Sequence, residues 1–288
     1  MKTICLTGIL LAGSVLVQAS GKPACRLFTA HGMEVEYSLM LQEMTGADMV
    51  FFGELHNNPI AHWMEIEMVT DLYREVGNRL MLAAEMFEAD NQLLLDEYLS
   101  GWISTGRFEE DARLWKNYST DYKPLVEFAR KHQLRFVASN VPRRYAAMVA
   151  AGGFEELEKL TCEALSWIAP LPVPYDPQVG SYRKMLKMDH GGGMTSDHLP
   201  KAQALKDATM AHFILAAWEP GQLVFHINGS YHSENHEGIL WYIEHYRPGT
   251  EVVTVATVLQ ENTEELDEEH RGKADYLIVV PANMTTTY

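Results

Sequence analysis

Six short apolar runs recur along the chain, and the segments between them have the spacing of helices. The runs contain few polar positions, which is typical of strands that are covered on both faces. They are residues 48–54, 80–87, 134–140, 223–229, 252–258 and 276–280. Because strands and helices alternate, the pattern predicts an α/β fold with a mainly parallel sheet flanked by helices.

Helices are predicted where apolar residues recur every three or four positions. In the first of them, Trp63, Met64, Met68 and Leu72 follow this spacing. The predicted helices are residues 60–76, 90–100, 107–115, 123–132, 143–151, 154–168, 199–218 and 236–246. The stretch 152–200 breaks the alternation, because it contains four prolines between 170 and 177 and then three consecutive glycines. We expect a helical insertion or lid there.

The first residues have the pattern of an export signal. Lys2 is followed by an apolar stretch at 4–17, and small residues around Ala19 suit cleavage by a signal peptidase. The stretch is shorter than the ~20 residues that a membrane-spanning helix needs. We therefore expect residues 1–19 to be a signal peptide, residues 20–288 to form one domain, and the protein to be exported to the periplasm or cell envelope.

The net charge limits the possible binding partners, and the cysteines bear on disulfide formation and lipid anchoring. The formal net charge of −16 argues against nucleic acids and anionic membrane surfaces as partners. Cys25 and Cys162 lie outside the signal, and they would form either a disulfide or two free thiols. Lys22 lies among the three residues before Cys25, where a lipidated cysteine follows small and apolar residues, so a lipid anchor at Cys25 is disfavoured.

Four predicted strands end in residues that bind ligands or exchange protons. Glu54 and His56 close the first strand and, being two residues apart, point to the same side. Glu85 closes the second, Arg143 follows the third, and His232 follows the fourth. Parallel sheets bind their ligands beyond the carboxyl ends of the strands. We therefore expect these five residues to build one site.

Two chemistries are open to the set Glu54, His56, Glu85 and His232. The four side chains would bind a divalent first-row metal that keeps a position for water, or a histidine would act as a general base beside a glutamate. Gly229-Ser230-Tyr231 lacks the second glycine of a nucleophile elbow, which disfavours serine hydrolysis. The glycine-rich loops of the common nucleotide sites do not occur in the sequence.

Five segments resemble the motifs of the ChaN family of bacterial haem-binding proteins, which is grouped with TIKI-type proteases and erythromycin-esterase-like proteins. The segments are GELHNNP at 53–59, EMF at 85–87, NVPR at 140–143, KAQALKDATMA at 201–211 and HINGSYH at 226–232. The resemblance extends over about residues 35–260. GExH alone is a weak signal, whereas all five segments in this order are specific.

The resemblance implies a haem-binding protein of the cell envelope that takes part in iron acquisition. It implies haem held between two subunits, and hence a homodimer, with a tyrosine ligand and a nearby histidine. Outer-membrane haem-uptake machinery would be a further partner. The TIKI-type relatives imply the alternative of a metal-dependent hydrolase, with Glu54 and His56 at its centre and Glu85 and His232 beside them.

The stretch 175–194 contains the expected haem contacts. Tyr182 and His190 are the candidate iron ligands and Met188 a further contact, while Arg143 and Tyr231 would contact haem from the strand ends. The same methionines and tyrosines also fit an amphipathic lid that packs into the core. The sequence has no CxxCH motif, so covalent haem attachment is excluded.

Overall fold

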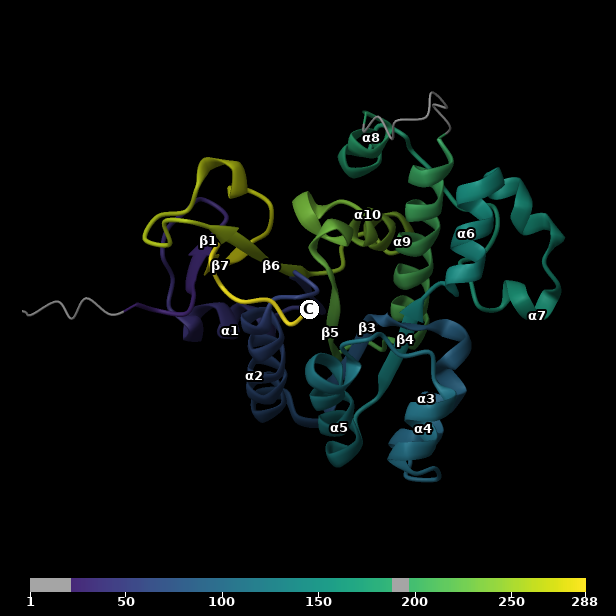
Figure 1. Ribbon diagram of the computed structural model, residues 1–288, viewed down its shortest axis with the longest axis horizontal. Helices are drawn as coiled ribbons and strands as arrows, with labels where there is room; N and C mark the ends of the chain where they lie inside the picture. The colour runs from purple at the N-terminus through teal and green to yellow at the C-terminus, as the bar shows by residue number, and fades with distance from the viewer. Residues whose placement is uncertain (1–21, 188–196) are drawn as a thin grey trace, which may run out of the picture.

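A computed structural model describes residues 22–187 and 197–288 and contains a seven-stranded sheet with helices on both faces (Figure 1). The strand order is β1-β7-β6-β2-β5-β3-β4, and all neighbours are parallel except β1 and β7. The strands are β1 (Arg26–Thr29), β2 (Met49–Glu54), β3 (Leu80–Glu88), β4 (Phe136–Asn140), β5 (Leu223–Gly229), β6 (Val252–Gln260) and β7 (Tyr276–Pro281). The predicted α/β class is confirmed.

Alternate residues of the central strands pack into two different cores. In β2, Val50 and Phe52 contact the core beneath one set of helices, whereas Met49 and Phe51 contact the core on the opposite face. Figure 1 shows these layers. On one side of the sheet lie α2 (Pro59–Val76), α3 (Gln92–Leu99) and α5 (Lys123–His132), and on the other lie α6 (Arg143–Gly152), α9 (His198–Ala217) and α10 (Ile239–Tyr246). Both faces are covered, so nearly every strand position is apolar, as the sequence pattern predicted.

Of the described α-helices, the first five along the chain pack on one face of the sheet, and the next five pack on the other. Those of the first core are α1 (Tyr37–Gly46), α2 (Pro59–Val76), α3 (Gln92–Leu99), α4 (Thr105–Asp111) and α5 (Lys123–His132). Those of the second core are α6 (Arg143–Gly152), α7 (Cys162–Leu165), α8 (Gly180–Lys187), α9 (His198–Ala217) and α10 (Ile239–Tyr246). No helix in the described ranges is long and apolar enough to cross a membrane.

Two elements were not predicted. β1 has four residues, of which only Phe28 is buried, so it lacks the continuous apolar pattern of the inner strands. It lies at the sheet edge and pairs antiparallel with β7. α1 begins after Glu36, whose side chain makes no capping hydrogen bond, so the helix has no local start signal.

The predicted helix 154–168 is wrong in its length. A 3-10 helix (Phe154–Lys159) ends before Thr161, whose hydroxyl accepts a hydrogen bond from the amide of Ala164 and starts α7. This second start divides the segment into two short helices. The remainder, up to α8, is irregular, and it contacts the second core through Ile168 and Val173. Cys25 and Cys162 are both free thiols.

Candidate functional site at the strand ends

The strand order brings the predicted site residues to one place. β2, β5, β3 and β4 are neighbours, so their carboxyl ends form one continuous edge. Glu54 pairs in register with Gly229 of β5, and Glu88 of β3 pairs with Asn140 of β4. A pocket of about 760 Å³ opens at this edge. Its lining includes all five residues expected to build the site, Glu54, His56, Glu85, Arg143 and His232.

Glu54 and His56 both line the pocket and contact each other. His56 Nδ1 lies 2.5 Å from Glu54 Oε1, and the hydroxyl of Tyr122 donates to the same oxygen at 2.7 Å. Burial alone would raise the pKa of Glu54, but the hydrogen bond with His56 and the proximity of His62 outweigh burial and lower this pKa to about 2. Glu54 is therefore a carboxylate that orients the imidazole.

His56 keeps its second ring nitrogen free. No hydrogen bond to Nε2 occurs within the described residues, and the side chain is 36% exposed at the pocket. The ring lies edge-on to Trp115, with a centroid separation of 4.9 Å. Although burial lowers the pKa of His56, the hydrogen bond to Glu54 and the charge of Glu85 raise it overall. His56 is thus available as a base or as a ligand.

His232, in contrast, is enclosed by carboxylates. Its Nδ1 lies 2.5 Å from Asp207 Oδ1, and its Nε2 lies 3.2 Å from Glu85 Oε1. The second oxygen of Glu85 accepts a hydrogen bond from the amide of Gly229 at 2.8 Å. Burial lowers the pKa of His232, but the charges of Glu85 and Asp207 raise it to about 10. Both ring nitrogens are therefore occupied, and His232 is a buried cation.

The four residues predicted as metal ligands do not form one ligand-spaced group. Within the described ranges, the groups with metal-ligand spacing are Glu54, His62 and Glu65, and separately Asp267, Glu269 and His270. His232 and Glu85 bind each other, so neither presents a free donor atom toward His56. Of the predicted set, only Glu54 lies in such a group.

The remaining predicted contacts fall at the pocket rim, inside the core, or outside the described residues. Arg143 begins α6 and donates from Nε to Glu88 Oε1 at 2.9 Å, with 72% of its side chain exposed. Tyr231 lines the pocket and donates to the carbonyl of Ser181 at 2.6 Å. Met188 and His190 lie outside the described residues.

Tyr182 requires a correction. It was expected as an iron ligand, but its side chain is fully buried in the second core. Its hydroxyl donates to Asp207 Oδ2 at 2.7 Å, and burial together with the Asp207 charge raises the pKa of the phenol above its usual range. Tyr182 does not line the pocket and instead supports the carboxylate that holds His232.

Several pocket residues had no clear signal in the sequence. Trp115 and Lys206 line the pocket, and so does Tyr288, which the hydrogen bond from the amide of Thr287 to the carbonyl of Asn57 (2.9 Å) holds nearby. Asp207 lies one residue after Lys206 on the predicted helix, but helical periodicity does not indicate that it pairs with His232.

Comparison with known protein families shows to which family the chain belongs. The model of the family described as haem-binding uptake, Tiki superfamily, ChaN matches residues 40–243. The chain belongs to the ChaN family. The description of the family names haem as the ligand that its members bind.

One solved ChaN structure has a similar fold. The chain is similar to ChaN of Campylobacter jejuni, described as binding haem cofacially, with 18% identity, a TM-score of 0.68, and coverage of 89% of this chain and 96% of that one. A Bacillus cereus protein is 13% identical over 84% of this chain and 90% of its own, with a TM-score of 0.50. The erythromycin esterase EreC is 11% identical, covering 85% and 78%, with a TM-score of 0.48. No curated protein matches the sequence.

The pocket of this ChaN-family chain fits haem in size and chemistry. Its volume lies within the range of about 300–1,000 Å³ that is usual for ligand sites. Leu55, Trp115 and Val141 supply apolar surface for a porphyrin, while Arg143 and Lys206 supply positive charge for carboxylates. The buried Oδ1 of Asn140 has no hydrogen-bond partner within the described residues, as expected for a polar atom that faces a ligand site.

Proposed function

We propose that this ChaN-family protein is exported and binds haem in the strand-end pocket, as a step in haem and iron acquisition in the cell envelope. The observation that carries the proposal is the free Nε2 of His56, because the neighbouring His232 and Glu85 already satisfy each other. A single free imidazole nitrogen above an anchoring carboxylate suits one bond to haem iron.

Each pocket residue has a distinct role in this proposal. Bound haem supplies an iron that takes axial ligands and two propionates that need cations. Glu54 orients His56 and increases the basicity of its Nε2. Arg143 and Lys206 line the pocket and would neutralise the propionates, and Trp115 would supply apolar surface for the porphyrin. Tyr231 and Tyr288 are the pocket phenols that remain for the tyrosine ligation implied by the family resemblance.

Titration with haemin tests the site. The haem-free protein is expected to show a saturable Soret shift at micromolar haemin. His56→Ala should weaken binding by at least tenfold, and Tyr231→Phe or Tyr288→Phe should change the ferric spectrum if the phenol binds iron. The buried Tyr182→Phe variant serves as a control and should keep the spectrum. The absence of any shift in the wild-type protein would refute the proposal.

Export is tested separately from haem binding. The full chain, expressed in a Gram-negative host, should appear in the periplasmic fraction with Ser20 as its first residue. A lysine in place of Leu10 or Leu11 interrupts the apolar stretch and should retain the uncleaved chain in the cytoplasm. An uncleaved wild-type chain in the cytoplasm would contradict export and leave the haem site unaffected.

The family resemblance also motivates a dimer with haem between two copies. Sedimentation of the haem-free and haem-loaded protein should show a shift from one copy toward two on loading. A monomer in both states would exclude the shared site while remaining compatible with a pocket that binds haem alone. Contact with outer-membrane uptake machinery is the step that would follow.

A second candidate is metal-dependent hydrolysis in the same pocket. The Glu54–His56 pair favours it, because a histidine whose Nδ1 is held by a carboxylate presents Nε2 as a general base. Ester and peptide substrates should then be turned over, with loss of at least 10²-fold in Glu54→Gln or His56→Ala. Turnover that resists both the substitutions and a chelator would exclude this candidate.

A further inference from the structure

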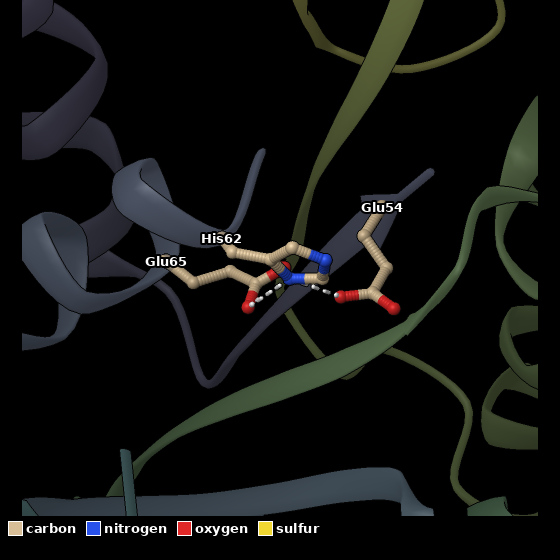
Figure 2. Close-up of side chains that lie close together, drawn as sticks. All are labelled: Glu54, His62 and Glu65. Carbon is tan, nitrogen blue, oxygen red and sulfur yellow. Dashed lines mark hydrogen bonds and ion pairs between the residues drawn. The ribbon is translucent and has the colours of Figure 1, made fainter. Parts of the chain in front are cut away.

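A second cluster of ionisable groups lies beneath the pocket, on the side of Glu54 that faces α2. His62 and Glu65 are three residues apart on α2 and therefore lie on the same helix face. Glu54 reaches them from the end of β2. Figure 2 shows the imidazole of His62 between the two carboxylates, with contacts to both.

The local sequence positions this cluster firmly. Asn58 caps α2, because its Oδ1 accepts hydrogen bonds from the amides of Ile60 and Ala61, both at 3.0 Å. Pro59 occupies the first turn, where its missing amide proton costs nothing. The chain therefore enters the helix in a defined direction after β2, and the first two turns of α2 lie against the strand end.

The cluster brings three carboxyl groups together in a dry environment. Glu54 is 1% exposed, Glu65 is completely buried, and Asp121 is 5% exposed. His62 is their ion-pair partner, and no lysine or arginine forms an ion pair with any of the three within the described ranges. Buried carboxylates require a cation or several hydrogen bonds. The imidazoles of His62 and His56 contact these carboxyl groups. Asp121 also accepts a hydrogen bond from the side-chain amide of Asn117. Glu65 has His62 as its ion-pair partner among the described residues.

Two carboxylate oxygens in the cluster have no hydrogen bond. Glu54 Oε2 and Glu65 Oε1 are both inaccessible and unpartnered among the described groups. Glu54 Oε2 nevertheless lies only 3.3 Å from His62 Nδ1, so it points into the cluster and not toward solvent. A buried acceptor left in this way has a large desolvation cost, which a bound ion would offset.

The contacts of His62 Nε2 show that this nitrogen carries a proton. Nε2 lies 3.1 Å from the carbonyl oxygen of His56, an atom that only accepts hydrogen bonds, so Nε2 donates. Asp121 Oδ2 lies 3.3 Å from the same nitrogen and supports this orientation. Such a partner fixes the tautomer of a metal-binding histidine. Nδ1 faces the carboxylates of Glu54 and Glu65, where a metal cation would take the place of a proton on this nitrogen.

The spacing of the donor atoms is that of ligands around a small ion. His62 Nδ1 lies 3.3 Å from Glu54 Oε2 and 3.4 Å from Glu65 Oε2. Ligands about 2.0–2.1 Å from a tetrahedral zinc ion are separated by about 3.3 Å. Direct N–H···O hydrogen bonds would be nearer to ~2.9 Å. All three ligand atoms lie within 4.8 Å of one another.

We propose that Glu54, His62 and Glu65 bind a divalent first-row transition metal ion, enclosed below the haem pocket, with the ligand spacing of tetrahedral zinc. Nitrogen and oxygen donors of this kind suit Zn²⁺ and related ions. Glu54 is shared between the two sites, since Oε1 holds His56 while Oε2 faces the ion. The ion therefore fixes the carboxylate that orients the pocket histidine.

Zinc binding to the full, haem-free chain tests the proposal. After treatment with a chelator, the wild-type protein should take up one Zn²⁺ per chain and become more resistant to heat. His62→Gln and Glu65→Gln should each weaken zinc binding by at least tenfold. Glu67→Gln, the same change on the exposed face of α2, should leave it unaltered, and so should His232→Gln in the pocket.

A measurement on the wild-type protein covers the case in which the variants fail to fold. X-ray absorption of the zinc-loaded chain should show a single imidazole and oxygen ligands. Two imidazoles would assign the ion to His56 and His232 and overturn the proposal, as would the absence of stoichiometric zinc. A loss of zinc in His232→Gln together with retention in Glu65→Gln would have the same meaning.

Discussion

His232 Nδ1 lies 2.5 Å from Asp207 Oδ1, and this contact joins the end of β5 to the middle of α9. Both groups are nearly inaccessible, and Tyr182 and Glu85 occupy their outer sides. The four side chains form a closed network that links the second core to the pocket. His232 therefore shapes the pocket wall as a fixed cation, while His56 presents the more exposed imidazole to the pocket.

Removal of the negative charge at Asp207 should destabilise the protein strongly. In Asp207→Asn the imidazolium of His232 loses one of two buried partners, and breaking a buried ion pair costs about 3–5 kcal/mol. The free energy of unfolding in urea measures the loss. Glu110→Gln, which breaks an exposed ion pair with Arg107, should cost less than about 1 kcal/mol. Equal losses in the two variants would show that the network contributes little.

The same network predicts a dependence of stability on pH. The folded-state pKa of His232 is raised to about 10 from its usual value of 6.5. Its contribution to stability is therefore fully present below about pH 6.5 and is lost as the pH rises toward 10. The difference in unfolding free energy between wild type and His232→Gln, measured with a chelator present, should be largest near pH 6. A difference that grows with pH would have the wrong sign.

Gly229 permits the close approach of His56. A Cβ atom at Gly229 would lie 2.7 Å from His56 Nε2 and 3.5 Å from Glu85 Oε2. Gly229→Ala should therefore displace the imidazole and weaken haemin binding by at least tenfold, as measured by the Soret titration. Gly106→Ala, where the added Cβ meets nothing within 4 Å, is the matched control. Unchanged affinity in Gly229→Ala would argue against His56 as the iron ligand.

The backbone conformation at Gly238 and its close contact with His232 require a glycine. Its φ is +58°, and an added Cβ would collide with the carbonyl oxygen of His232. We expect Gly238→Ala to lower the free energy of unfolding by more than about 2 kcal/mol, because strain and a backbone clash combine. Gly249→Ala, with φ +80° and open space around the new atom, isolates the strain and should cost about 1–2 kcal/mol. Thermal or urea unfolding of both variants separates the two effects.

The strands and their functional ends were predictable from local pattern alone. Parallel strands covered on both faces have continuous apolar runs, which can be recognised in the sequence. The residue types that follow each run can be identified without knowing which strands are neighbours. Glu54, His56, Glu85, Arg143 and His232 were found in this way, and the structure places them around one pocket. The ChaN motifs could be recognised in the sequence because they include the residues at these strand ends.

Tertiary structure alone decided which contacts each of these residues makes. The position of β5 between β2 and β3, and the packing of α9 beside it, gave His232 the partners Glu85 and Asp207 and left His56 free. Packing also buried Tyr182 and brought His62 and Glu65 of α2 to Glu54. Sequence periodicity reports which face of an element is buried. The choice of contacts between distant side chains depends on how whole elements pack, and that information is absent from any single stretch of the chain.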